Sequence, residues 1–200
     1  RKLFEPEGRV FATAAKRVLE PSQSGFSPAK SVYGPFRITK TMQRMLNQLK
    51  EKAKAILEGK EADGVLGLRK GLFDVIQPHV FTTPAELDTL VLEPKWLFAK
   101  MARSILRAKP AAYRLAVAVR GCDERAIVEL IKRSQIDRGR ILTIGYACGA
   151  DQAKACLCSR PYPGKLDAGS AVEGVDPFAD ERVKAFLDGD GAQRMERWTA

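Results

Sequence analysis

The sequence predicts an α/β fold with a mostly parallel sheet and flanking helices, and the main indication is a pair of buried strands joined through a helix. The segments 113–119, "YRLAVAV", and 140–147, "RILTIGYA", are continuous apolar runs, as in strands buried on both faces. Between them, 123–135, "DERAIVELIKRSQ", has helical periodicity, and Asp123 stands where an N-cap is expected. A strand, a helix and a second strand at this spacing indicate a right-handed βαβ unit with parallel strands.

Further elements surround this unit. Residues 39–58 carry methionine, leucine and isoleucine at three- and four-residue steps, which predicts a helix that Gly59 ends as a C′ residue. The segment 83–90 has a helix-start pattern with Thr83 as the N-cap. We therefore expect an α/β core over 60–150. The remaining predicted elements are strands at 63–69 and 72–81 and helices at 94–109 and 177–189.

Composition restricts the class of protein but does not identify the kind of molecule that it binds. The 200 residues are enough for one substantial core, or for one core plus an appendage. The net charge of +10 suits a nucleic acid, an acidic protein surface or a polyanionic cofactor. Nucleic acid is disfavoured because no basic stripe alternates with aromatic residues. No long apolar run and no secretory signal are visible, so we expect a cytoplasmic protein without a membrane span and with reduced cysteines.

The chain divides into three predicted segments. Residues 1–37 are basic, aperiodic and interrupted by prolines, yet they contain four phenylalanines. We expect an extended arm that lies on another surface and grips partner subunits. Residues 38–163 are expected to form the α/β core that carries the cysteines, and residues 164–200 a loop and a short helix.

All four cysteines of the chain lie between positions 122 and 158. Cys122 follows the first buried strand and Cys148 follows the second, so we expect both at the carboxyl edge of the sheet. Open α/β sheets bind their ligands at that edge. Cys156 and Cys158 come after a predicted loop, 149–155, which is short enough to fold back over the same edge. The sequence therefore predicts one site that contains all four thiols.

Four interpretations of these cysteines stay open on spacing alone. They are small buried hydrophobic residues, zinc ligands, a redox disulfide across Cys156 and Cys158, or ligands of one iron–sulfur cluster. Structural zinc sites favour Cys-x-x-Cys turns, whereas this pair is Cys-x-Cys. For a cluster, alternate residues of an extended segment would point the same way, roughly 7 Å apart at the backbone, and reach different corners of a cubane. The spacing follows no standard ferredoxin pattern.

The segment "RLAVAVRGCDERAIVELIKRSQIDRGRILTIGYACG", with the later "ACLCSRPYP", resembles the beta-subunit family of coenzyme F-420 hydrogenases and dehydrogenases. The resemblance covers about 63–163 and implies an iron–sulfur flavoprotein subunit of a hydrogenase, formate dehydrogenase or heterodisulfide-reductase-like complex. Together with the confinement of all four cysteines to 122–158, it predicts one [4Fe–4S] cluster. The residues that match the family's two turns and its later cysteine pair are Gly121, Cys122 and Asp123, then Gly145 and Cys148, then Cys156 and Cys158. The implied cluster ligands are Cys122, Cys148, Cys156 and Cys158.

Two features of that family, a ferredoxin-type cysteine module and a flavin site, have no clear counterpart in this sequence. Its members often carry a ferredoxin-type Cys-x-x-Cys-x-x-Cys module, which this sequence lacks, so either another subunit supplies those clusters or the chain continues into a C-terminal module. No clear flavin motif is present. The turn at Gly121, Asp123 and Arg125 opens a helix, and helix N-termini favour phosphates, so these residues are the candidates for contact with FAD. A plain tight turn is the alternative.

These observations predict an electron-transfer iron–sulfur subunit of a larger redox complex, an oxidoreductase subunit without substrate chemistry of its own. It would pass electrons between a partner's clusters or flavin and its own [4Fe–4S] cluster. The single histidine, His79, lies in a strand pattern, which disfavours histidine-based catalysis. The alternative is a non-redox interaction or nucleic-acid-binding module in which the cysteines are structural.

Overall fold

The structure is a computed structural model that describes residues 39–199, so the predicted arm at 1–37 lies outside the described residues. Within them, five strands form one mixed sheet in the order β2-β1-β4-β5, and β3 pairs with β1. The α/β class with a mostly parallel sheet is confirmed, because three of the five strands run parallel. These are β1 (Gly64–Lys70), β4 (Leu115–Val119) and β5 (Ile141–Gly145), whereas β2 (Ile76–Phe81) and β3 (Leu90–Val91) run antiparallel to β1.

The predicted βαβ unit consists of β4, α3 (Gly121–Lys132) and β5. β4 is fully buried, and its residues pair with β5 along its whole length, up to Val119 opposite Gly145. The N-cap of α3 is Arg120, and Asp123 lies inside the first helical turn. The N-cap prediction for Asp123 is wrong because its carboxylate instead accepts a hydrogen bond of 2.7 Å from the backbone N–H of Phe98, in another segment.

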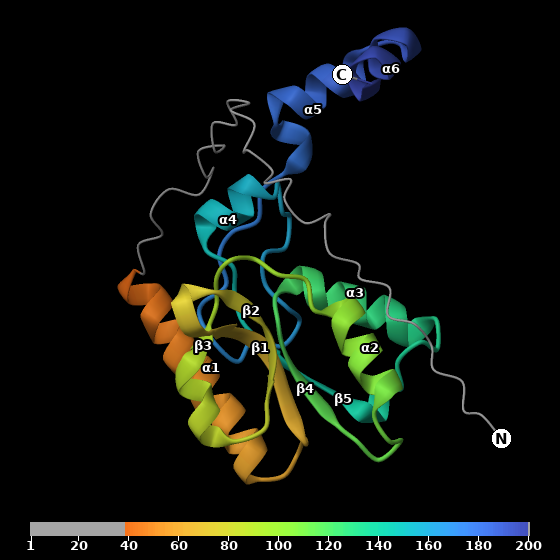
Figure 1. Ribbon diagram of the computed structural model, residues 1–200. Coiled ribbons are helices and arrows are strands. Elements are labelled where there is room, and N and C mark those ends of the chain that lie inside the picture. The colour runs from red at the N-terminus through yellow and green to blue at the C-terminus, as the bar shows by residue number, and fades with distance from the viewer. Residues whose placement is uncertain (1–38, 200) are drawn as a thin grey trace, which may run out of the picture. The chain divides into compact units, whose positions relative to one another are not determined.

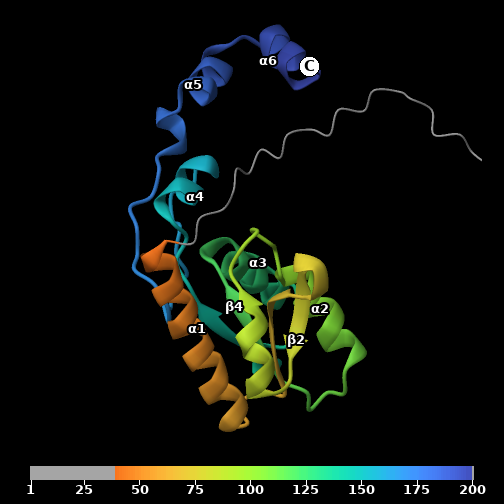
Figure 2. The same cartoon turned by 60° about the vertical axis from the view of Figure 1, so that its left-hand side comes forward.

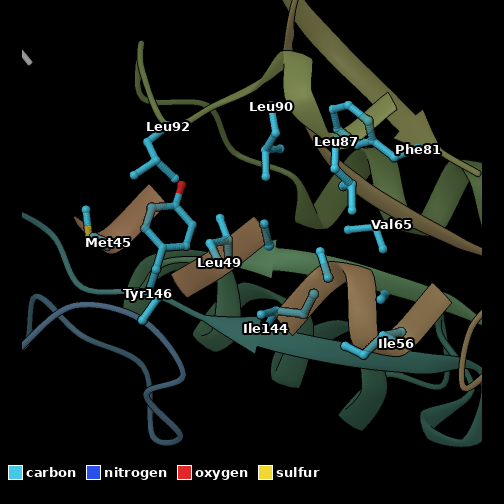
Figure 3. Close-up of a cluster of buried hydrophobic side chains, with 14 of the residues drawn as sticks. Met45, Leu49, Ile56, Val65, Phe81, Leu87, Leu90, Leu92, Ile144 and Tyr146 are labelled. Atoms are coloured by element: carbon cyan, nitrogen blue, oxygen red, sulfur yellow. The ribbon is translucent and has the colours of Figure 1, made fainter. Parts of the chain in front are cut away.

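The helix α1 (Lys40–Glu58) covers one face of the sheet (Figures 1 and 2). Thr39 caps it, since its side chain accepts a hydrogen bond from a backbone N–H of the first turn at 3.3 Å. The predicted helix is therefore confirmed. Its left-handed C-terminal residue is Lys60, with a φ of 53°, and not Gly59, with a φ of −74°. The buried stripe of α1, which packs against one set of alternating strand residues (Figure 3), consists of Met45, Leu49, Ala53 and Ile56.

The helices α2 (Ala99–Ala108) and α3 cover the opposite face of the sheet (Figures 1 and 2). Both faces of β4 are thus covered, which explains why its sequence is apolar without alternation. The predicted helix at 94–109 begins only at Ala99, and the preceding residues 93–98 form a non-helical connection that we call the strap. The residues on this side of the sheet include Ala102, Leu106, Leu115, Val117, Val119 and Ile127.

The antiparallel half of the sheet differs from the prediction in detail. The predicted strand at 72–81 begins only at Ile76, because the 3-10 helix η1 (Leu72–Asp74) precedes it. The predicted helix at 83–90 is the 3-10 helix η2 (Pro84–Thr89), and Thr83 makes no side-chain capping hydrogen bond. Instead, the carboxylate of Glu86 accepts a hydrogen bond of 2.9 Å from the backbone N–H of Thr82.

The chain returns to the sheet after the cysteine segment. Ala168 is buried and forms a parallel bridge with Tyr146. Among the described residues, no helix is both long enough and apolar enough to cross a membrane. The predicted helix at 177–189 corresponds to η4 and α5, whereas α4 and α6 have no counterpart among the predicted elements. The bounds of the remaining elements are η3 (Arg138–Arg140), α4 (Ala150–Ala155), η4 (Pro177–Ala179), α5 (Glu181–Asp188) and α6 (Gly191–Thr199).

Candidate functional site

One pocket of about 310 Å³ lies at the carboxyl edge of the parallel strands. Its walls carry the side chains of all four cysteines and of two cations, Lys95 and Arg125. The structure therefore brings together the four thiols that the sequence predicts at this edge. The other lining residues are Gln152, Ala153, Leu157, Ser159 and Pro161.

The parallel register of β4 and β5 positions two of the cysteines, Cys122 and Cys148, which we call the strand-end pair. Val119 and Gly145 pair at the ends of the two strands, and a cysteine follows each of them by three residues. Both thiols are partly buried. Burial raises the pKa of both, to about 11 for Cys148. Both thiols therefore keep their protons at neutral pH unless a metal or a cation stabilises the thiolate.

The other two cysteines, Cys156 and Cys158, lie at the end of α4, and we call them the helix-end pair. They belong to a Schellman turn: Cys156 is the C-cap, Leu157 has a φ of 47°, and the backbone N–H of Cys158 donates to the carbonyl of Ala153 at 2.9 Å. The predictions of a loop at 149–155 and of an extended Cys-x-Cys segment are therefore wrong. The turn nevertheless leaves both cysteines on the wall of the pocket.

Gly121 allows the segment that follows the last cysteine to cross the start of α3. A Cβ at this position would lie 2.5 Å from the carbonyl oxygen of Tyr162 and 3.0 Å from that of Arg160, both closer than ordinary contact. The returning backbone therefore packs where a side chain would stand. It is held there by a hydrogen bond of 2.9 Å from the backbone N–H of Cys148 to the carbonyl of Pro161.

Gly145 has the same role at the end of β5. A Cβ there would overlap the carbonyl oxygen of Lys165. The carboxylate of Asp167 accepts a hydrogen bond of 2.8 Å from the backbone N–H of Gly145, and the backbone N–H of Asp167 donates to the carbonyl of Gly145 at 2.8 Å. The two glycines of the predicted turns are therefore required by the close approach of a later segment of the chain.

Two cations form hydrogen bonds to the helix-end pair. Lys95 Nζ donates to Cys156 Sγ at 3.1 Å, and Arg125 Nη2 donates to Cys158 Sγ at 3.8 Å. Arg125 also donates through Nη1 to the carbonyl of Arg160 at 3.2 Å, which orients its guanidinium. The hydrogen bond to Cys156 raises the pKa of Lys95. Lys95 could not be identified from the sequence, because it lies 61 residues from its partner.

A buried network at the end of β4 holds the strap in place. Arg120 is only 1% exposed, and its Nη2 donates to the carbonyl of Leu92 and to Glu93 Oε1, each at 2.7 Å. Its guanidinium lies over the ring of Tyr146, 5.1 Å from the centroid. Glu93 Oε1 also accepts a hydrogen bond from Nε2 of Gln152, a residue of the pocket wall. These contacts offset part of the cost of burying a guanidinium and connect the strap to the pocket.

A single metal ion and an iron–sulfur cluster place different demands on the positions of thiolate ligands. In residues 39–199, no group of three His, Cys, Asp or Glu side chains is placed to hold one metal ion, and all four cysteines are free thiols. A zinc site needs all its sulfurs within about 2.3 Å of one ion, whereas a four-iron cluster binds each thiolate at a different iron. Soft thiolates around one pocket, with N–H donors directed at two sulfurs, are side chains of the kind that could hold a [4Fe–4S] cluster.

The three flavin candidates lie in different surroundings. Arg125 lines the pocket, whereas Gly121 lies against carbonyl oxygens of the returning segment. Asp123 is fully buried, and burial raises the pKa of its carboxyl group. Of the three, Arg125 is the one that lines the cysteine pocket.

Comparison with known proteins finds no family model that matches the sequence. The chain is similar to a protein of Methanococcus maripaludis, "F420-dependent formate dehydrogenase 1 subunit beta", with 37% identity over 101 residues. The similar region is 48% of this chain and 25% of the relative, so the chain spans about a quarter of the length of the curated relative that it matches. The name of this relative describes a subunit of a formate dehydrogenase.

Proposed function

We propose that this chain is an iron–sulfur electron-transfer subunit of a multi-subunit redox complex. One observation carries the proposal: the four cysteines line one pocket, and a cation is directed at the sulfur of two of them. If the cysteines were only small buried hydrophobic residues, there would be no reason for a lysine and an arginine to donate to their sulfurs. The similarity to a formate dehydrogenase beta subunit agrees with the proposal.

Each group of residues has a role in this proposal. The strand-end pair, Cys122 and Cys148, would hold one side of a [4Fe–4S] cluster from the ends of β4 and β5. The helix-end pair, Cys156 and Cys158, would hold the other side from the end of α4. When bound, such a cluster accepts and releases single electrons. Because the ligands bind as thiolates, the thiols release their protons on binding, which the neighbouring cations favour.

The proposed partners are other redox subunits. An electron carrier without substrate chemistry is useful only between a donor and an acceptor, and the relative is itself named a subunit. Hydrogenase, formate dehydrogenase and heterodisulfide-reductase-like complexes are the candidate classes, and the arm at 1–37 is proposed to contact them. FAD is a secondary proposal, in which the guanidinium of Arg125 would meet its phosphates.

The test is anaerobic reconstitution with iron and sulfide, applied to the wild-type chain and to four single Cys→Ser variants. Serine nearly keeps the shape of the side chain but removes the soft thiolate, so each variant should lose cluster absorption. Ser159→Ala changes another residue of the same pocket wall without removing a thiol. It is the matched control and should take up iron as the wild type does.

Two results would contradict the proposal at different levels. A wild-type chain that takes up only zinc, or no metal, would favour the alternative of a non-redox interaction or nucleic-acid-binding module. If Cys122→Ser leaves cluster content, spectrum and stability unchanged, Cys122 is core packing, and the set of four cysteine ligands is wrong.

A further inference from the structure

Both cations of the pocket act on the helix-end pair. Lys95 Nζ lies 3.1 Å from the sulfur of Cys156, and Arg125 Nη2 lies 3.8 Å from the sulfur of Cys158. The two donors come from different segments, the strap and α3, and converge on two cysteines of one turn that are separated by a single residue. Cys156 is the exposed cysteine of the four, so this is the side of the site that faces solvent.

Lys95 is positioned from both sides along the chain. Two residues before it, Glu93 accepts a hydrogen bond of 2.7 Å from the buried Arg120. Three residues after it, the backbone N–H of Phe98 donates to the buried carboxylate of Asp123 at 2.7 Å. Arg120 and Asp123 belong to the same turn as Cys122, at the start of α3. The strap is therefore anchored to a turn that carries a candidate ligand, which limits where Lys95 Nζ can reach.

Positive charge and N–H donors at a ligand sulfur affect the two redox states unequally. Reduction adds a negative charge to a cluster and its thiolates, so such groups stabilise the reduced state more than the oxidised state. Charge-assisted hydrogen bonds are about twice as strong as neutral ones. The shorter contact of Lys95 gives it the larger expected effect of the two cations.

We propose that Lys95 and Arg125 raise the reduction potential of the site by donating to Cys156 and Cys158, with Lys95 as the stronger of the two. The inference rests on the proposed function, because it assigns these side chains to a cluster held by the same cysteines. Arg120 and Asp123 act indirectly, as positioning residues that hold the strap.

The experiment is an anaerobic redox titration of the reconstituted full-length chain, followed by electron paramagnetic resonance, after the iron content of each variant has been measured. Methionine keeps most of the length of lysine but removes its charge and its donors. At a fixed potential, Lys95→Met should lower the ratio of reduced to oxidised cluster about tenfold, or about 59 mV for a one-electron couple, and Arg125→Met about threefold.

Lys154→Met is the matched control. Lys154 is an exposed residue of α4, two positions before Cys156, so the substitution removes an equal charge close to the site. Because an exposed charge is screened by solvent and salt, we expect a change in the ratio of less than about twofold.

Two further substitutions cover the case in which Lys95→Met does not load iron. Lys95→Arg keeps both charge and donor and should behave nearly as the wild type, and Lys95→Gln keeps a neutral donor and should give an intermediate ratio. That order supports the inference. Variants of Lys95 and Arg125 that hold wild-type iron but shift the ratio no more than Lys154→Met overturn it and leave the proposed function intact. Loss of iron in both Lys95→Gln and Lys95→Met also overturns it, in favour of a role in assembly. A wild-type chain without iron overturns both the inference and the proposed function.

Discussion

Replacing Gly121 by alanine should loosen the cysteine pocket without changing any cysteine. The new Cβ would stand 2.5 Å from the carbonyl oxygen of Tyr162 and 3.0 Å from that of Arg160. Both are backbone atoms, and ordinary contact begins at 3.4 Å, so the returning segment has to move away from α3. No rotation of a side chain can relieve this overlap.

The magnitude follows from the hydrogen bonds that hold this segment. Cys148 N–H donates to Pro161 at 2.9 Å, Arg125 donates to Arg160 at 3.2 Å, and Gly164 N–H donates to Glu124 Oε2 at 2.6 Å. A net loss of about 1 kcal/mol for each bond gives about 3 kcal/mol of destabilisation. The higher helix propensity of alanine offsets up to about 1 kcal/mol. We therefore expect the free energy of unfolding to fall by about 2–3 kcal/mol.

Urea unfolding of the metal-free, reduced chain measures this loss, and iron uptake under anaerobic conditions reports on the pocket. Gly149→Ala is the matched control, because it makes the same substitution beside Cys148 and its Cβ would meet nothing within 4 Å. Gly149 is the N-cap of α4, so the control should lose no more than about 1 kcal/mol and should keep its iron. A Gly121→Ala chain with wild-type stability and full iron uptake would refute the packing of the returning segment against α3.

Three further predictions test the fold. Val117→Asp should abolish soluble expression, because an unpaired carboxylate at this fully buried position of β4 costs several kcal/mol, on the order of the whole stability of a domain. In thermal melts, Lys60→Gly should raise the free energy of unfolding by about 0.5–1 kcal/mol, because the exposed Lys60 has a φ of 53°, which glycine adopts without strain. The control Ala55→Gly, at an exposed position inside α1, should lower the free energy of unfolding by about 1 kcal/mol. Burial lowers the pKa of His79 from its ordinary 6.5, so the unfolded chain binds the proton more readily. Stability in urea should therefore fall as the pH drops below 6.5, and His79→Gln should reduce that fall.

Each of these has a clear contrary result. Normal expression and melting of Val117→Asp would show that β4 is not covered on both faces. A loss of stability in both Lys60→Gly and Ala55→Gly would contradict the left-handed conformation at Lys60. Identical dependence of stability on pH in the wild type and in His79→Gln would show that the fold does not shift the pKa of His79.

The βαβ unit could be predicted because its signals are local. β4 and β5 are short apolar runs, the helix between them has clear periodicity, and handedness and parallel pairing follow from the connection. The position of Cys122 and Cys148 at one sheet edge then follows from the topology alone. The helix α1 could also be predicted from local signals, since Thr39 caps it and its buried stripe repeats at helical spacing.

The geometry of the helix-end pair could not be predicted in the same way. A Schellman turn usually has glycine at its left-handed position, and here that position is Leu157, so nothing in "ACLCS" marks the end of a helix. The residues "ADQAKA" are good helix formers, and they were the available signal for α4.

The residues that contact the sulfurs could not be predicted from the sequence, for a different reason. Lys95 meets Cys156 across 61 positions of the chain, and Arg120 meets Glu93 across 27. Such contacts depend on how the strap packs against the turn after β4, and no local pattern encodes that packing. For the same reason, the role of Asp123 was not predictable. Aspartate is a favoured N-cap residue, but here its carboxylate accepts a hydrogen bond from the backbone N–H of Phe98.

The iron and acid-labile sulfide content of the full-length chain, purified without oxygen, tests the central claim most directly. We expect about four irons and four sulfides per chain, a brown colour, and an electron paramagnetic resonance signal on reduction. A colourless protein that contains zinc alone, or no metal, with four thiols open to alkylation, would contradict the assignment of the cysteine pocket to an iron–sulfur cluster.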